Sequence, residues 1–282
     1  MVDLPQRSGA LLVDRSARGK LAFTGEQALW FCDQLLTNQL VNLAPGQGAE
    51  ALMLTPHGRI VAALRLAHPA EGQVLADLEP PASRAAELAG FFAGRIFATR
   101  VAVRDMSEEL GLFTLLGPAA DEIARAALHV SQESMPGREE HASAQVGDVV
   151  VVRVVRPGAG LELFAPRGQC RALTGELERA GAEPVSEEGY DELRIRSGLA
   201  RDRVDYDDSF LPQEAAMERA VHFAKGCYLG QEAVAMAQRG RVKRRVRQLQ
   251  LEGEAKPGPL FAAGADGSGG EVGRLTSIAG PG

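Results

Sequence analysis

The stretch that organises this chain is KGCYLGQE at residues 225–232, which holds Cys227 between two glycines and close to Lys225. The residues that follow, AVAMAQ at 233–238, are good helix formers, and Gly240 is a natural end for that helix. We therefore expect Cys227 on a tight loop just before a helix N-terminus. The partial positive charge of the helix end and the ammonium group of Lys225 would both favour a thiolate there.

A lone cysteine also has a simpler explanation, because free cysteine is most often a small core residue. Cys32 fits that explanation well, since it shares the apolar face of the helix expected after residue 24. Cys170 and Cys227 complete a set of three distant cysteines without a Cys-x-x-Cys pair. An odd, scattered set predicts reduced thiols and a cytoplasmic protein, and we assign no metal-ligand set.

The composition is that of an ordinary globular protein. The 282 residues are 45% hydrophobic and 24% charged, with a net charge of −6. This balance argues against nucleic-acid binding by bulk attraction but leaves a local basic patch open. There is no apolar run of the roughly 18 residues that a membrane helix needs. Residues 1–7 lack the apolar core of a signal peptide, so we expect a soluble protein that is not secreted.

Strands outnumber helices in the pattern, and hairpins outnumber strand–helix–strand units, which predicts an α+β fold. Thr24 and Gln27 would form a capping box for the first helix, and Ser83 would cap the second. Strands are expected at residues 11–13, 20–23, 50–55, 59–66, 74–78, 95–104, 112–116, 149–155, 161–164, 248–252 and 271–277. Helices are expected at residues 25–37, 83–92, 118–128, 170–180 and 231–238.

A basic segment follows the motif helix. Residues 239–247, RGRVKRRVR, hold six basic residues in nine positions. Single-stranded nucleic-acid sites combine such charge with stacking aromatic residues, and no aromatic is interleaved here. A strand that turns its basic side chains to water explains the segment as well, and both interpretations stay open.

The motif at 225–232 closely resembles that of the YgfZ family, the folate-binding relatives of the glycine cleavage system T-protein (aminomethyltransferase). The similarity runs from about residue 20 to about 278. Weaker segments agree in the same order: FTGEQA at 23–28, LLTN at 35–38, PGQG at 45–48, LTPHGRIV at 54–61 and LRIRSG at 193–198.

The resemblance implies three lobes around a central pocket, with a small antiparallel β-barrel at the C-terminus. The first lobe would combine residues 1–50 with 110–195, and residues 51–109 would form an inserted lobe. Residues 196–239 would hold the motif and a linker, and residues 240–282 the barrel. Relatives carry further strands after the GRLTS segment at 273–277, which leaves open whether the barrel is complete.

The resemblance also implies tetrahydrofolate, or a folate derivative, as the ligand. T-proteins use an aspartate near the folate amine, but Ala62 and Ala63 occupy the matching stretch. Alanine cannot steer a proton or stabilise an iminium-like centre. Aminomethyl transfer is therefore in doubt, and whether the protein is an enzyme stays open.

Several residues are candidates for folate contacts. Glu162 could accept two parallel N–H bonds from the pterin, or could be a strand glutamate that faces water. Tyr190 stands where the family has an arginine, so that Arg194 or Arg196 would hold the folate tail. Asn38 completes the candidate set.

YgfZ-type proteins are implicated in the assembly or repair of iron–sulfur clusters, including those of tRNA-thiolating enzymes. One thiol beside a lysine suits transient persulfide, mixed-disulfide or single-iron contact, whereas permanent cluster binding takes about four thiolates. The resemblance therefore implies a folate-binding accessory protein that meets iron–sulfur enzymes or cluster carriers through Cys227. Lys225 would tune the thiol or hold an anion, and the rest of the motif loop would be Gly226, Tyr228, Gly230, Gln231 and Glu232.

Two alternatives remain. The first is a tetrahydrofolate-dependent aminomethyltransferase. The second is an RNA-binding module that contacts tRNA through residues 239–247.

Overall fold

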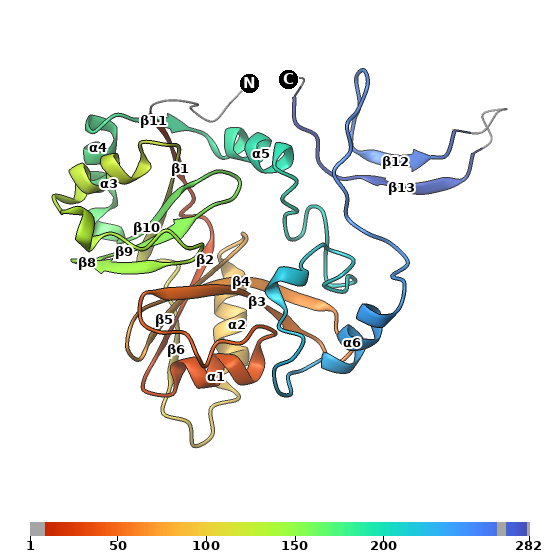
Figure 1. Ribbon diagram of the computed structural model, residues 1–282, viewed down its shortest axis with the longest axis horizontal. Helices are drawn as coiled ribbons and strands as arrows, with labels where there is room; N and C mark the ends of the chain where they lie inside the picture. The colour runs from red at the N-terminus through yellow and green to blue at the C-terminus, as the bar shows by residue number, and fades with distance from the viewer. Residues whose placement is uncertain (1–8, 264–268, 281–282) are drawn as a thin grey trace.

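Two β-sheets, one of six strands and one of five, pack against each other and form the centre of the structure (Figure 1). The computed structural model describes residues 9–263 and 269–280. Residues 1–7, where no signal peptide is expected, lie outside the described residues, as does part of the glycine-rich segment that precedes the last strand. None of the helices in the described ranges combines the length and apolar character needed to cross a bilayer. The mixed architecture confirms the predicted α+β class.

The first sheet has six strands in the order β11-β1-β7-β10-β9-β8. Its strands are β1 (Ala10–Asp14), β7 (Leu110–Leu116), β8 (Ser143–Val146), β9 (Val149–Val154), β10 (Gly160–Pro166) and β11 (Ala182–Val185). Helices α3 (Ala120–Leu128) and α4 (Cys170–Arg179) bury one face of it. Helix α5 (Glu187–Arg196) packs Tyr190 and Leu193 on the other face, beside β1. Two 3₁₀ turns, Gln132–Ser134 and Arg167–Gln169, complete this part.

The second sheet has five strands in the order β3-β4-β5-β2-β6. Its strands are β2 (Gly19–Thr24), β3 (Gln47–Leu54), β4 (Ile60–Ala70), β5 (Gln73–Leu78) and β6 (Ala102–Asp105). Helices α1 (Ala28–Leu35) and α2 (Ser83–Ala93) cover its lower face in Figure 1. Phe23, Phe31 and Phe92 meet there in tilted and edge-to-face contacts. Cys32 is fully buried in the same core, which confirms its predicted structural role.

The two sheets do not divide the chain at residue 50, where the sequence predicts a lobe boundary. Strand β2, helix α1 and strand β3 lie in the second sheet, so that the first lobe takes only β1 from the N-terminal region. The physical reason is that the chain crosses between sheets directly after β1, at residues 15–18. Strand β2 then pairs with both β5 and β6, in the interior of the second sheet.

The third part of the chain wraps around the end of the second sheet. It contains a 3₁₀ turn at Glu218–Ala220 and helix α6 (Gln231–Arg239). Tyr206, Met217, Tyr228 and Val234 pack there against strands β3 and β4. Strands β12 (Gly258–Phe261) and β13 (Glu271–Leu275) form a separate two-stranded sheet at the upper right of Figure 1. The described residues form no more of the predicted barrel than this pair, and residues 248–252 form no strand.

Local capping differs from the sequence prediction. Helix α1 begins after Gln27 without a side-chain cap, because the Gln27 side-chain oxygen accepts a hydrogen bond from the Arg100 backbone N–H instead (2.7 Å). Ser83 is the first residue of α2 rather than its cap. The strand expected at 95–104 is reduced to β6 at its end.

The motif is anchored by a glycine-to-glycine contact. Gly230 has φ +82° as the residue before α6, and a Cβ there would lie 2.4 Å from the Thr55 carbonyl oxygen and 2.8 Å from the Gly58 Cα. Gly58, at the tip of the β3–β4 hairpin, has φ +73° and faces Gly230 and Ala233 in return. These two positions explain why the hairpin and the motif both carry glycine.

We expect Gly230→Ala to lower the free energy of unfolding by about 2 kcal/mol or more, because it combines left-handed backbone strain with a backbone clash. The measurement is urea denaturation followed by circular dichroism. Gly226→Ala is the matched control in the same loop, since a Cβ there meets no atom within 4 Å. Equal stability of the two variants would show that the glycine-to-glycine contact is dispensable.

Candidate functional site

Strand alternation sends polar side chains into the space between the two sheets. In β4, Ala62, Leu64 and Leu66 pack under the helices, so Ala63 and Arg65 face the other sheet. In β10, Leu161 and Leu163 pack under α3 and α4, so Glu162 faces the second sheet. These charged positions meet across the interface of the sheets.

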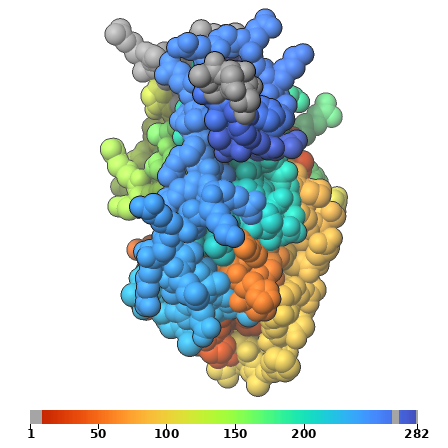
Figure 2. Space-filling view, turned by 90° about the vertical axis from the view of Figure 1, so that its right-hand side faces the viewer, coloured from red at the N-terminus to blue at the C-terminus, as the bar shows by residue number. Residues whose placement is uncertain are grey.

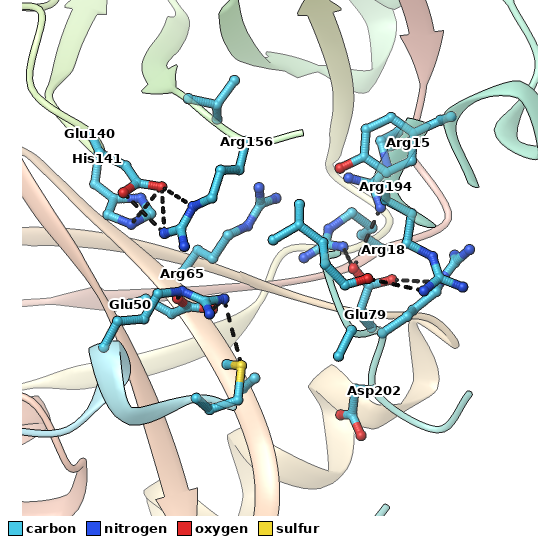
Figure 3. A pocket seen from close by; sticks show the side chains of 18 of the residues that line it. Arg15, Arg18, Glu50, Arg65, Glu79, Glu140, His141, Arg156, Arg194 and Asp202 are labelled. Carbon is cyan, nitrogen blue, oxygen red and sulfur yellow. Dashed lines mark hydrogen bonds and ion pairs between the residues drawn. The ribbon is translucent and has the colours of Figure 1, made fainter. Parts of the chain in front are cut away.

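A cavity of about 100 Å³ opens there, where the sheets meet α5 and the loop at 199–219. Figure 3 shows Glu140, His141 and Arg156 on one side and Arg15, Arg18 and Glu79 on the other. Among the described lining residues the arginines are Arg15, Arg18, Arg65, Arg156, Arg194, Arg201 and Arg219. The lining carboxylates are Glu50, Glu79, Glu140 and Asp202. The wall therefore has more positive than negative side chains.

Arginines hold the buried carboxylates of the site in their ionised form. Asp77 accepts hydrogen bonds from Arg18 Nε and Arg65 Nη2, each with a donor–acceptor distance of 2.6 Å. Burial raises the pKa of Asp77, but these two guanidinium groups outweigh it and hold the pKa below its usual value. Glu79 pairs with Arg15, Arg18 and Arg201, which lower its pKa in the same way against the effect of burial.

The other three lining carboxylates are paired too. Glu50 lies 2.7 Å from Arg219, Glu140 lies 2.9 Å from Arg156, and Asp202 lies 2.7 Å from Arg84. A carboxylate paired with arginine is a poor proton donor, because the pair stabilises its ionised form. The lining carboxylates are thus suited to holding arginines in place rather than to general acid catalysis.

His141 is the histidine among the residues that line the cavity. Burial lowers its pKa, while Glu140, with its nearer oxygen 4.0 Å from His141 Nε2, opposes that shift. Burial therefore favours the neutral imidazole, which can both donate and accept a hydrogen bond.

Arg65 crosses the middle of the site. Its Nη1 donates to Glu162 at 2.8 Å and its Nη2 to Asp77. Its Nε is buried without a partner among the described residues, which leaves a donor that a ligand or water could satisfy. Tyr190 and Tyr206 add aromatic surface to the wall, and Arg15 stacks on the Tyr190 ring at 3.8 Å.

Lys20 fixes the segment that carries Arg15 and Arg18 into the cavity. Its side chain is fully buried, and its Nζ donates to the carbonyl oxygens of Ser16 (2.8 Å) and Arg18 (2.7 Å). Burial lowers the pKa of Lys20 to about 8, and the nearby Arg167 adds to the shift.

The predicted folate residues divide into two groups. Tyr190 and Arg194 line the cavity, although Arg194 already pairs with Asp191 and Asp205. Glu162 is buried rather than facing water; it is held by Arg65 and Thr114, beside a smaller cavity next to the first.

Arg196 and Asn38 do not line the cavity. Arg196 donates to the Gly280 carbonyl oxygen, and Asn38 donates to the Glu50 carbonyl oxygen. Both side chains therefore donate hydrogen bonds to backbone carbonyl oxygens of other segments of the chain.

Cys227 lies on the loop before α6, where the sequence predicts it, and its side chain is exposed. The prediction for Lys225 is corrected. Its Nζ is buried and donates to the carbonyl oxygens of Asp33 (2.5 Å), Leu36 (3.0 Å) and Asn38 (2.7 Å). Lys225 thus neutralises the C-terminal end of α1, so that its donors serve the fold. Of the other motif residues, Tyr228 is buried in the adjoining core, whereas Gly226 and Glu232 are exposed.

Neither Cys227 nor Lys225 lines the cavity. Gln231 donates a long hydrogen bond to the Lys225 carbonyl oxygen (3.4 Å), which supports its predicted role in holding the loop. The motif and the charged cavity are therefore separate features of the molecule.

Sequence reasoning missed most of the charged lining, above all Arg15, Arg18, Arg65 and Glu79. A signal for them did exist. Arg65 and Asp77 stand inside strands whose other residues are mostly apolar, and a charge inside such a strand needs a buried partner. The identity of each partner depends on how the two sheets pack.

We expect Lys20 to give the protein a measurable pH dependence. Its pKa is about 8 in the folded protein against roughly 10.4 when unfolded. Between these values the unfolded chain binds more protons, so the free energy of unfolding rises with pH, by at most about 1.4 kcal/mol per pH unit. Urea denaturation at pH 8 to 10.5 should show this rise, and Lys20→Met should show a smaller one, because Lys225, whose pKa burial also lowers, is still present. Lys256→Met, at an exposed lysine, should behave like the wild type; parallel curves for Lys20→Met and wild type would contradict the assignment.

This chain is similar to proteins that are named as transferases. A chloroplastic transferase of Arabidopsis thaliana is 26% identical over 280 residues, which cover 97% of this chain and 62% of that protein. This chain thus spans less than two thirds of that relative. The aminomethyltransferase of Rubrobacter xylanophilus is 28% identical over 269 residues, covering 93% of this chain and 71% of that protein.

The crystal structure of the glycine cleavage system aminomethyltransferase T from Bartonella henselae has the same fold. It matches with a TM-score of 0.77 and 23% identity over 96% of this chain and 74% of that one. Residues 5–225 match the family described as the GCVT N-terminal domain. The chain therefore belongs to the GCVT N-terminal domain family.

Proposed function

We propose that this protein binds tetrahydrofolate or a folate derivative in the arginine-rich cavity and serves as an accessory protein for iron–sulfur enzymes, which it meets through Cys227. The observation that carries the folate part is the cavity wall, where arginines outnumber carboxylates and Ala63 faces the space between the sheets. The iron–sulfur part rests on the resemblance of the motif to that of the YgfZ family and on the exposure of its thiol.

The cavity suits an anion that carries an aromatic ring. Arginines donate to carboxylates in a planar, bidentate geometry, and the glutamate tail of a folate is such a carboxylate. Arg156 and Arg219 are the half-exposed members of the set, with side-chain exposures of 35% and 34%. Tyr190 and Tyr206 supply aromatic surface against which a pterin or benzoyl ring can pack.

Glu162 needs a rearrangement before it can bind a pterin. The Arg65 guanidinium already donates to it, much as the amidine edge of a pterin would. A pterin at this position would therefore have to displace Arg65 toward Asp77, its second partner.

Aminomethyl transfer is the second candidate, since the relatives include named aminomethyltransferases. The residues that line the cavity argue against aminomethyl transfer. Ala63 presents a methyl group where the family mechanism needs a carboxylate, and the lining carboxylates are committed to arginines. A turnover assay with an aminomethyl donor and tetrahydrofolate distinguishes the two, and product formation would favour the transferase.

The position of Cys227 supports contact with another molecule rather than with the folate. Its side chain is exposed, outside the lining of the cavity, on a loop that Gly230 and Lys225 hold to the second sheet and to α1. An exposed thiol on a fixed loop suits transient contact with a client protein or cluster carrier.

We expect isothermal titration calorimetry to show tetrahydrofolate binding to the wild type. Arg156→Gln should weaken it about tenfold, because a charge-assisted hydrogen bond contributes about 1.5–3 kcal/mol. Arg179→Gln is the control, since that arginine is exposed on α4 and pairs only locally with Glu176 among the described residues. No heat of binding in the wild type, or equal affinity in Arg156→Gln, would contradict folate binding at this site.

We expect Cys227→Ser to fold with wild-type stability and to bind folate with wild-type affinity, because its side chain is exposed and apart from the cavity. In cells that lack the protein, the variant should fail to restore the activity of a cluster-dependent enzyme. Cys170→Ser, a change at a half-buried cysteine on α4, controls for the loss of any thiol. Full rescue by Cys227→Ser would exclude a role for the thiol.

A further inference from the structure

The segment that follows α6 lies on the surface and has two different sides. It runs without helix or strand from Gly240 to residue 257, joining α6 to the two-stranded sheet. Figure 2 shows it in blue across the face of the molecule, from the lower part towards the top. Within it, Arg244, Val246 and Gln248 contact the body of the protein. We call residues 239–247 the basic strap.

Even-numbered residues hold the segment to the body. Arg244 donates to the Ser209 carbonyl oxygen (2.6 Å) and lies over the Phe210 ring (3.7 Å). The Val246 backbone N–H donates to the Glu214 carbonyl oxygen (2.7 Å), and the Val246 side chain packs on the cluster that contains Tyr206 and Met217. Gln248 donates to the carbonyl oxygens of Ile195 (3.0 Å) and Arg196 (2.8 Å).

Odd-numbered residues of the strap carry its outward charge. Successive side chains of an extended chain point to opposite sides, so the residues between the anchors face solvent. These exposed cations are Arg239, Arg241, Lys243, Arg245 and Arg247. Within the described structure, an ion pair holds one of them, Arg245, whose partner Glu218 lies 3.9 Å away.

The cations form a row rather than a broad patch. An extended chain advances about 3.4 Å per residue, so the row is at most about 27 Å long. Arg239 ends α6, and the row therefore begins at the helix whose other end carries the motif loop. The net charge of the chain is −6, which makes this row a local exception to an acidic protein.

We propose that the basic strap binds the phosphodiester backbone of a single-stranded nucleic acid, RNA or DNA. A row of exposed, flexible cations matches a linear polyanion. A bilayer surface is more often met by an amphipathic helix, and a duplex major groove admits a helix or a two-stranded ribbon; the strap is neither. No aromatic side chain stands among residues 239–247, so phosphates rather than bases carry the binding and sequence preference is weak.

This inference does not depend on folate or on Cys227. The strap lies outside the lining of the cavity, and its anchors come from residues 195–214. Failure of nucleic-acid binding would leave the proposed function untouched, and the reverse also holds.

The test is fluorescence anisotropy of the full chain with a short labelled oligouridylate and with the matching oligodeoxythymidylate, from 50 to 200 mM salt. Each phosphate contact contributes about −0.7 to the slope of log affinity against log salt. Replacing Arg241, Lys243 and Arg247 together by serine should reduce the size of that slope by about 2 and weaken binding at least tenfold at low salt. Tighter binding of the RNA would add a 2′-hydroxyl contact to the backbone contacts.

The control replaces Arg95, Arg104 and Arg171 by serine, which removes the same charge from exposed positions elsewhere and should leave binding unchanged. Equal losses in both triple variants would overturn the proposal, as would binding that does not depend on salt or is absent in the wild type. Vesicles of phosphatidylserine and a polyglutamate peptide serve as competing probes. Tighter binding of either than of both oligonucleotides would assign the strap to a membrane or to an acidic protein instead.

Discussion

The structure depends on a layer of arginine–carboxylate pairs between its two sheets. Arg18 and Arg65 both reach Asp77, Arg65 also reaches Glu162, and Arg15 spans Glu79 and Glu187. Asp77, Glu162, Arg15 and Arg18 are almost completely buried. A buried charge without a partner is very costly, so Glu162 of the first sheet depends on Arg65 of the second, and Asp77 depends on Arg65 and on Arg18 from the crossing segment. The packing of one sheet on the other is therefore coupled to the pairing.

That layer also decides what the cavity can do. The lining carboxylates form ion pairs with arginines, and the lining arginines outnumber the lining carboxylates. A site of this kind is better at holding a negatively charged ligand than at moving protons. His141 is the exception, because burial lowers its pKa and so favours its neutral form. Together with Ala63 on the wall, this composition is the basis on which we propose ligand binding for a fold shared with aminomethyltransferases.

The motif separates into a structural part and an exposed part. Gly230 fits against the hairpin tip at Gly58, and Lys225 closes the end of α1 through three carbonyl oxygens. Cys227, between them, stays exposed. The two anchors explain why a thiol on a loop can be held in one place without being buried, which is the arrangement that contact with a second molecule requires.

The sequence by itself determined the fold class, the hairpin at residues 50–66, the core position of Cys32 and the loop that presents Cys227 before a helix. These features follow from short-range rules, namely strand alternation, glycine in tight turns and the helical spacing of apolar residues. Tertiary structure alone decided that β2 and α1 belong to the second sheet, that Lys225 serves a helix end about 190 residues away, and that Arg15, Arg65 and Glu162 meet. The physical reason is that a charged side chain takes its role from its partners, and those partners are set by the packing of segments distant in the chain.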